Sequence, residues 1–274
     1  ANYTFNIMSN LEVGYTFDQY DKSDYQSLYK NDVRDYSNVQ HNVHALYNYT
    51  FNGKHTLTVG ADYLRDYLMS YQFTDNADHT MHTADAFGQF DWNPTERLNV
   101  IAGLRFDYFS DSNVRHLSPH LGMMYKIGSC SLRGSYSQGF RSPTLKEMYM
   151  VFNMANMMMI YGNPDLKSET SHNFSVSAEY TKNRYNFSVT GYYNLVHNRI
   201  NTVYSEDPKG QIYTNTDKMD IAGIDANISA KYPCGLGYRL SYTYIHEFMR
   251  DGQKKFTDTR PVSYTHLTLP TICS

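Results

Sequence analysis

The sequence predicts an all-β fold: an antiparallel up-and-down transmembrane β-barrel that is incomplete, with about eleven strands. Three observations predict it. Apolar and polar residues alternate with a period of two in segment after segment, the apolar side of these segments excludes charge, and the connections alternate between short and long. Period two is the spacing at which side chains point to opposite faces of a strand.

Composition and charge are compatible with this fold. The chain has 274 residues, of which 41% are hydrophobic and 27 are tyrosine, and its net charge of −3 gives no support to nucleic-acid binding. No run of 18 apolar residues occurs, which excludes a helical membrane protein. A mean hydropathy of −0.59 still fits a barrel wall, because only every second residue of such a strand faces lipid.

The clearest strand is predicted between Leu98 and Tyr108. One face carries apolar residues, namely Leu98, Val100, Ala102, Leu104, Phe106 and Tyr108. The other face carries Asn99, Gly103, Arg105 and Asp107. Strict alternation over this length indicates a strand that separates two different environments.

Ten further segments repeat the pattern. They span residues 11–18, 42–51, 56–63, 83–92, 116–126, 132–137, 173–180, 185–195, 222–231 and 238–247. Their apolar faces contain no Asp, Glu, Lys or Arg. Because Arg or Lys on a lipid-facing position costs roughly 2–4 kcal/mol at the midplane, this exclusion favours lipid on one side and water on the other. A soluble β-sandwich with a tyrosine-rich core is the alternative.

The connections predict two unlike rims. Five short connections hold turn residues, at 52–54, 93–97, 127–129, 182–184 and 233–235. Five long connections are polar, at 18–36, 71–82, 141–170, 199–217 and 249–257. Short turns on one rim and long loops on the other are typical of bacterial outer-membrane barrels.

The two ends of the sequence differ from the rest. The chain opens with Ala1 and has neither a starter methionine nor a signal peptide, so we expect that either processing or fragmentation removed the true start. From Val262 onward the residues resemble one reading frame of a common sequencing adapter. We therefore predict two parts, a partial barrel over residues 1–261 and a non-native tail over 262–274.

The longest predicted loop begins and ends with two boxes, GFRSPTLKEMY (139–149) and GNPDLKSET (162–170). Both resemble the paired boxes of TonB-dependent outer-membrane receptors, in matching order and at strand ends. The residues that carry the resemblance are Phe140, Arg141, Ser142, Pro143, Glu147, Asn163, Pro164, Asp165 and Leu166. Their roles are open between shaping the loop and contacting a ligand.

The resemblance implies a 22-stranded barrel in the cell outer membrane, filled by an N-terminal plug. It also implies energised uptake of a scarce ligand such as an iron–siderophore, haem or cobalamin, driven by the inner-membrane TonB complex through the plug. Neither the plug nor the C-terminal strands occur in this sequence. A passive porin, and an outer-membrane enzyme or adhesin, remain alternatives from other classes.

Between the boxes lies an aromatic and methionine-rich segment. Our candidate ligand-binding residues are Tyr149, Met154, Met157, Met158, Met159 and Tyr161. Methionine adapts to apolar ligands and packs irregular gaps, and its thioether also binds haem iron or copper(I). Some haem-type members of the family that the boxes resemble carry a histidine between them, and none lies between Arg141 and Asn163 here, which weakens the haem interpretation. The sequence predicts no catalytic residue, no metal site and no resident cofactor, hence no enzyme.

Overall fold

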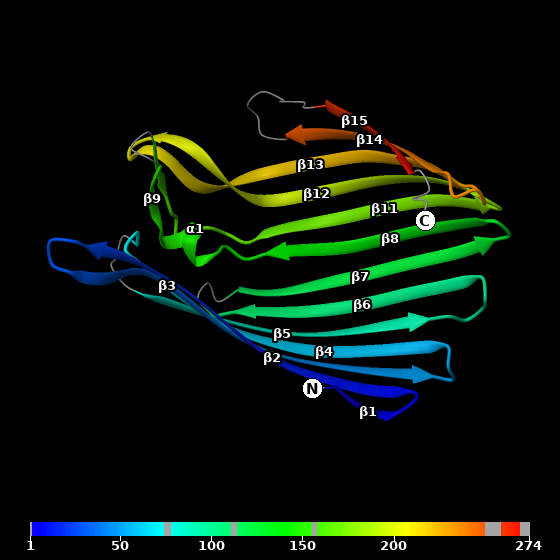
Figure 1. The fold of residues 1–274 in the computed structure, drawn as a ribbon, viewed down its shortest axis with the longest axis horizontal. Coiled ribbons are helices and arrows are strands. Elements are labelled where there is room, and N and C mark those ends of the chain that lie inside the picture. The colour runs from blue at the N-terminus through cyan, green and yellow to red at the C-terminus, as the bar shows by residue number, and fades with distance from the viewer. Residues whose placement is uncertain (1, 74–77, 111–113, 155–157, 250–258, 269–274) are drawn as a thin grey trace, which may run out of the picture.

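The chain folds into one curved, open sheet (Figure 1). The computed structural model describes residues 2–73, 78–110, 114–154, 158–249 and 259–268. Sequence neighbours pair antiparallel from β1 to β8, β11 follows β8, and β12 to β15 complete the path. This is the single wall of an up-and-down barrel, and no second layer of described residues packs on it.

All eleven predicted strands are confirmed, and they correspond to β2–β8 and β11–β14. Their bounds are β2 Ser9–Gln26, β3 Asn31–Phe51, β4 His55–Ser70, β5 His79–Trp92, β6 Leu98–Phe109, β7 Val114–Ile127, β8 Cys130–Arg141, β11 Glu169–Lys182, β12 Tyr185–Glu206, β13 Lys209–Lys231 and β14 Gly237–Met249. The structure adds four shorter strands, β1 Asn2–Asn6, β9 Val151–Met154, β10 Met158–Tyr161 and β15 Thr259–Thr268, and one helix, α1 Leu145–Tyr149.

The apolar face of the sheet is uncovered. Leu104, Val189 and Ile224, on strands far apart in the wall, are 49%, 52% and 50% exposed. A soluble sandwich would bury these side chains against a second sheet. The sandwich alternative is therefore wrong, and the open sheet leaves the apolar face free to meet lipid. We call this side of the wall the outer face.

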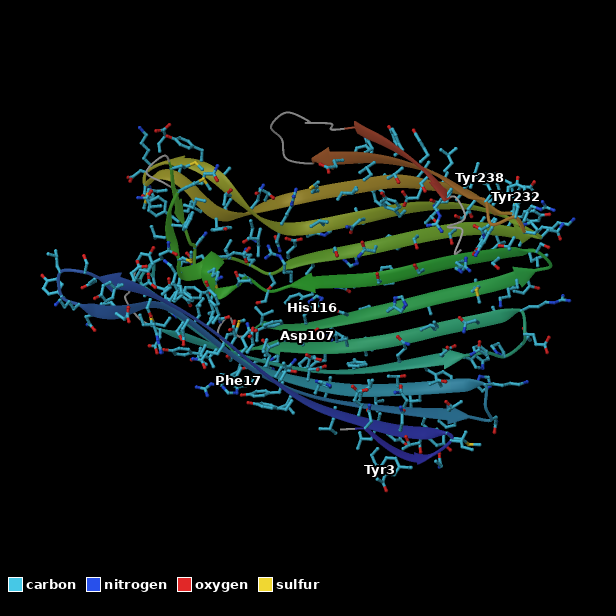
Figure 2. All side chains as sticks on the ribbon, in the orientation of Figure 1. Tyr3, Phe17, Asp107, His116, Tyr232 and Tyr238 are labelled. Atoms are coloured by element: carbon cyan, nitrogen blue, oxygen red, sulfur yellow. The ribbon has the colours of Figure 1, made fainter. Side chains whose placement is uncertain are left out.

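The opposite, inner face carries the charges. Arg105 bridges two carboxylates, with nitrogen–oxygen distances of 2.9 Å to Asp85 on β5 and 2.9 Å to Asp107 on its own strand. Both aspartates are buried despite the open sheet. Asp107 also pairs in register with His116 of β7, and the two lie side by side near the ends of β6 and β7 that face the long loops (Figure 2).

The two rims differ as predicted. At the short-turn rim the backbone takes left-handed conformations that favour glycine or asparagine, as at Asn52 and Gly53, with φ of 51° and 63°, and at Asn183, with φ of 56°. The other rim, the long-loop rim, holds the hairpin tips of β2–β3 and β12–β13 together with α1 and β9 (Figure 1).

Two predicted loops are wrong. Residues 18–36 and 199–217 lie almost entirely in strands, because β2–β3 and β12–β13 run on as long hairpins to the turns at 27–30 and 207–208. Beyond the apolar band both faces of a strand meet water, so the alternation that reveals a strand disappears there. The predicted loop at 249–257 lies almost wholly outside the described residues.

The predicted tail at 262–274 overlaps β15, which pairs antiparallel with β14 up to Gly237–Thr268. Such pairing uses backbone groups that every sequence provides, so it does not distinguish a native strand from an appended one. Residues 269–274 lie outside the described part of the chain. The boundary at 261 stays a prediction.

Candidate ligand-binding loop

The segment between the two boxes is folded. The chain leaves β8 at Arg141, forms α1, turns through β9 and β10, and re-enters the wall at Glu169. Figure 1 shows α1 and β9 at the long-loop rim, between the β2–β3 and β12–β13 hairpins. The segment is therefore a compact structure on the rim, whose shape follows from the box residues.

The first box builds a charged clasp. Thr144 caps α1 by accepting a hydrogen bond from the Glu147 backbone N–H at 3.3 Å, and Glu147 accepts one from the Thr144 N–H at 2.9 Å. This is a capping box, which satisfies two otherwise unpaired donors. Arg141 Nη1 donates to both Glu147 carboxylate oxygens at 2.9 and 3.0 Å, and its Nη2 lies 3.6 Å from Glu169. Arg141 thus ties the helix to the ends of both flanking strands.

A small apolar core lies beneath the helix. Leu145 and Met148 are 2% and 3% exposed, and they pack with Leu68 at the end of β4 and Phe73 in the loop that follows. Pro143 of the first box is also fully buried. The box therefore positions α1 so that its two apolar residues close this core, which fixes the loop to its neighbour across the rim.

Other parts of the first box support the same packing. The ring of Phe140 stacks on His116, with centroids 4.2 Å apart and planes 15° apart. Ser142 is buried as well. Backbone bonds continue the attachment, because the Val151 N–H donates to the Gln72 carbonyl at 2.7 Å.

The second box attaches the loop to the β12–β13 hairpin, on the side of the loop opposite β4. The Asn163 amide donates to the Tyr213 carbonyl of β13 at 3.0 Å, and its Oδ1 accepts from the Asp165 N–H at 2.9 Å. Asn215 and Lys167 exchange two further bonds of 2.7 and 2.8 Å. Leu166 is buried, whereas Pro164 and Asp165 are exposed. The asparagine thus holds a turn and anchors it to the β12–β13 hairpin.

The structure separates the predicted ligand-binding residues. Tyr149 stacks on His79 of β5, with ring centroids 3.9 Å apart and planes 7° apart, so this ring is part of the packing. Met159 and Tyr161 lie against β13, where Gly210 leaves room for the Met159 carbonyl and the Tyr161 ring. Met157 lies outside the described residues.

The two remaining methionines belong to an apolar face. Met154 and Met158 are register partners in the β9–β10 hairpin, and Phe152 and Ile160 form the next pair on the same face. Phe152 and Met154 are 37% and 41% exposed. We call these four residues the hairpin face. Phe152 and Ile160 were not among the ligand-binding residues predicted from the sequence. Their period-two spacing, Phe152 with Met154 and Met158 with Ile160, is nevertheless visible in it.

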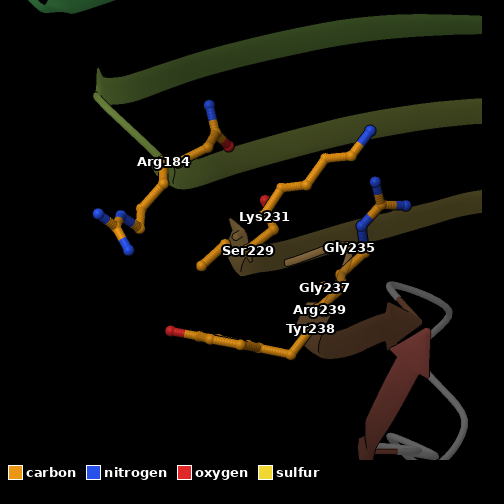
Figure 3. A pocket seen from close by; sticks show the side chains of 9 residues that line it. Arg184, Ser229, Lys231, Gly235, Gly237, Tyr238 and Arg239 are labelled. Atoms are coloured by element: carbon orange, nitrogen blue, oxygen red, sulfur yellow. The ribbon is translucent and has the colours of Figure 1, made fainter. Parts of the chain in front are cut away.

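A separate hollow of about 710 Å³ lies at the short-turn rim (Figure 3). Arg184, Lys231 and Arg239 line it, together with Tyr238. None of the predicted ligand-binding residues borders it. Within the described residues no helix has the length and apolar character needed to cross a membrane.

The chain matches the family model described as TonB dependent receptor-like, beta-barrel, over residues 1–271. It is 27% identical over 220 residues to the iron-regulated outer membrane virulence protein of Vibrio cholerae, which covers 73% of this chain and 33% of that protein. It is 31% identical over 130 residues to the vitamin B12 transporter BtuB of Photobacterium profundum, covering 46% of this chain and 20% of that one.

Solved structures show the same fold. The siderophore receptor PirA from Pseudomonas aeruginosa superposes with a TM-score of 0.72 at 15% identity, over 97% of this chain and 62% of that one. The copper transporter OprC gives a TM-score of 0.66 at 16% identity, over 90% and 43%. The chain spans about a third of the length of the first curated relatives it matches. Fold and family-model match together place this chain in the TonB-dependent receptor family, as part of its β-barrel.

Proposed function

We propose that the chain forms part of the wall and one ligand-contacting loop of an outer-membrane receptor. The receptor takes up a scarce ligand, such as an iron–siderophore, haem or cobalamin, with energy from the inner-membrane TonB complex. The observation that carries the proposal is the loop between the boxes, held on two sides of the rim and presenting an uncharged hairpin face. The four residues of that face suit a ligand with apolar or aromatic surface.

Two lines of support point to uptake of this kind. Two relatives are named as a vitamin B12 transporter and as a probable TonB-dependent siderophore receptor, so their names cover more than one ligand chemistry. The clasp around Arg141 and Glu147, together with the bond from Asn163 to β13, holds the loop through several polar bonds. A preorganised loop loses less entropy when it binds its ligand, which favours capture at low concentration.

Energy dependence tests the proposal. Cells that express the full-length receptor take up labelled ferric siderophore, haem or cobalamin, and a protonophore then collapses the proton gradient. We expect uptake of the accepted ligand to stop while surface binding, measured on ice, persists. Uptake that continues after the collapse, with open conductance of the purified protein in planar bilayers, would show a passive porin instead.

A further inference from the structure

Basic side chains lie on the outer face at the end of its apolar band that is nearer the long-loop rim. On β4 the outward positions Leu57, Val59, Ala61 and Tyr63 are followed by Arg65, which is exposed. Arg65 pairs in register with His41 of β3 and His82 of β5. Register partners share a face, so these three residues form a row across three strands, which we call the basic row.

Tyrosines below the row orient its histidines. The hydroxyl of Tyr15 lies 2.8 Å from His41 Nδ1, and the hydroxyl of Tyr63 lies 2.7 Å from His82 Nδ1. In both pairs the histidine comes two residues before the register partner of the tyrosine on the next strand. Each bond fixes one histidine ring of the basic row through its Nδ1.

A hollow of about 460 Å³ lies directly below the basic row on β5. Its floor is formed by residues 84–86 of β5, and its sides by Phe106 and Tyr108 of β6 and by Arg115 of β7. The carboxylate of Asp85 points away from the hollow to the inner face, where it pairs with Arg105 at 2.9 Å. Arg115 is exposed and lies over the Tyr108 ring at 5.9 Å from the ring centroid. The hollow is therefore apolar along its length and cationic at the end nearer the long-loop rim.

We infer that the basic row, Arg115 and this hollow bind one anionic lipid of the outer leaflet. The phosphate of the headgroup lies between Arg65, His82 and Arg115, and an acyl chain runs down over Ala84 and Ala86. Charge on the outer face is costly at the midplane and tolerated near the interface. There a basic residue gains about 1 kcal/mol from anionic headgroups, and guanidinium groups match phosphate geometry. The inference rests on the proposed membrane placement and not on ligand uptake.

The test uses the full-length receptor purified in detergent and analysed by native mass spectrometry. The probe is an acylated glucosamine disaccharide that carries two phosphates, compared with its dephosphorylated form and with excess inorganic phosphate as competitor. We expect the wild type to retain the phosphorylated lipid. Arg65→Gln with Arg115→Gln should weaken binding about fivefold per arginine, roughly 30-fold together. Arg65→Lys with Arg115→Lys keeps the charge and should restore most of the binding.

Two further variants separate the parts of the site. Ala84→Phe fills the hollow and should weaken the lipid without altering any cation, while Arg239→Gln, an exposed arginine on the inner face, serves as the matched control. Equal binding of the dephosphorylated lipid, or unchanged binding by the double glutamine variant, would overturn the inference. The inference would also be overturned if inorganic phosphate displaced the probe and Ala84→Phe had no effect. That pair of results would reveal an anion site that does not hold a lipid. Loss of energised uptake leaves this result unaffected, so the two proposals fail separately.

Discussion

Arg141, the last residue of β8, donates two hydrogen bonds of 2.9 and 3.0 Å to the carboxylate of Glu147 in α1. The Glu147 side chain is only 17% exposed and also accepts from the Thr144 backbone. One carboxylate therefore serves the strand end, the helix start and the turn between them. This relationship explains why an arginine and a glutamate occur six residues apart in the first box.

Replacing Glu147 with glutamine should loosen the loop and leave the wall intact. The change removes charge-assisted hydrogen bonds and weakens the helix cap, which together contribute about 1–2 kcal/mol. Amide exchange across α1 should then accelerate about tenfold, while amides of β6 and β7 stay unchanged. Hydrogen exchange with mass spectrometry measures this, with Glu96→Gln in an exposed turn as control. Equal protection of α1 in both variants would refute the clasp.

The small core beneath α1 should respond to truncation. Met148→Ala removes a side chain that is 3% exposed and should cost about 2–5 kcal/mol of local stability. Met154→Ala, at a position 41% exposed, should cost well under 1 kcal/mol. Limited proteolysis between Ser142 and Ser168 compares the two. Similar cleavage rates would mean that Met148 does not anchor the loop.

Gly162 should not tolerate a side chain. A Cβ built on it would lie 2.7 Å from the Met148 carbonyl oxygen and 2.9 Å from the Met150 nitrogen, both backbone atoms that are held in place. Gly162→Ala should therefore displace the start of the second box and raise proteolysis there. Gly134→Ala is the control, because a Cβ at that position meets nothing within 4 Å. A Gly162→Ala receptor with wild-type protection would contradict this packing.

The hairpin face predicts which methionines affect affinity. Met154→Ala and Met158→Ala should each weaken binding of the transported ligand about three- to tenfold, because each removes apolar contact area. Met159→Ala, on the opposite face of the same hairpin, should change affinity less than twofold. Competition binding on the full-length receptor measures this. A larger effect at Met159 than at Met154 and Met158 would reject the hairpin face as the contact surface.

The sequence predicted the wall well, for a physical reason. Within the apolar band each strand separates lipid from water, so the outward positions must be apolar and the alternation is regular. Beyond the band this requirement ends, which is why residues 18–26 and 199–206 were taken for loop although they continue β2 and β12. There only pairing with a neighbouring strand decides the conformation.

The candidate loop was predicted only in part. The helix α1 was missed because five residues give too short a periodic pattern, although Thr144 and Glu147 already had the spacing of a capping box. Ligand contact by Tyr149 stays a prediction, and the stacking of its ring on His79, a residue some 70 positions earlier in the chain, was not foreseen. Contacts between loops that are distant in sequence leave no local periodic signal.

The central claim is that the outer face of the wall meets lipid and the inner face does not. Two adjacent residues of β7 test it most directly, because Leu121 is outward and 52% exposed while His120 faces inward. A fluorophore is attached to a single cysteine introduced at either position, in a full-length receptor whose own cysteines, Cys130 and Cys234 among them, are replaced by serine. The labelled receptor is reconstituted in vesicles with doxyl-labelled lipid. We predict strong quenching at position 121 and little at 120. Equal quenching at both positions, or none at 121, would contradict the account.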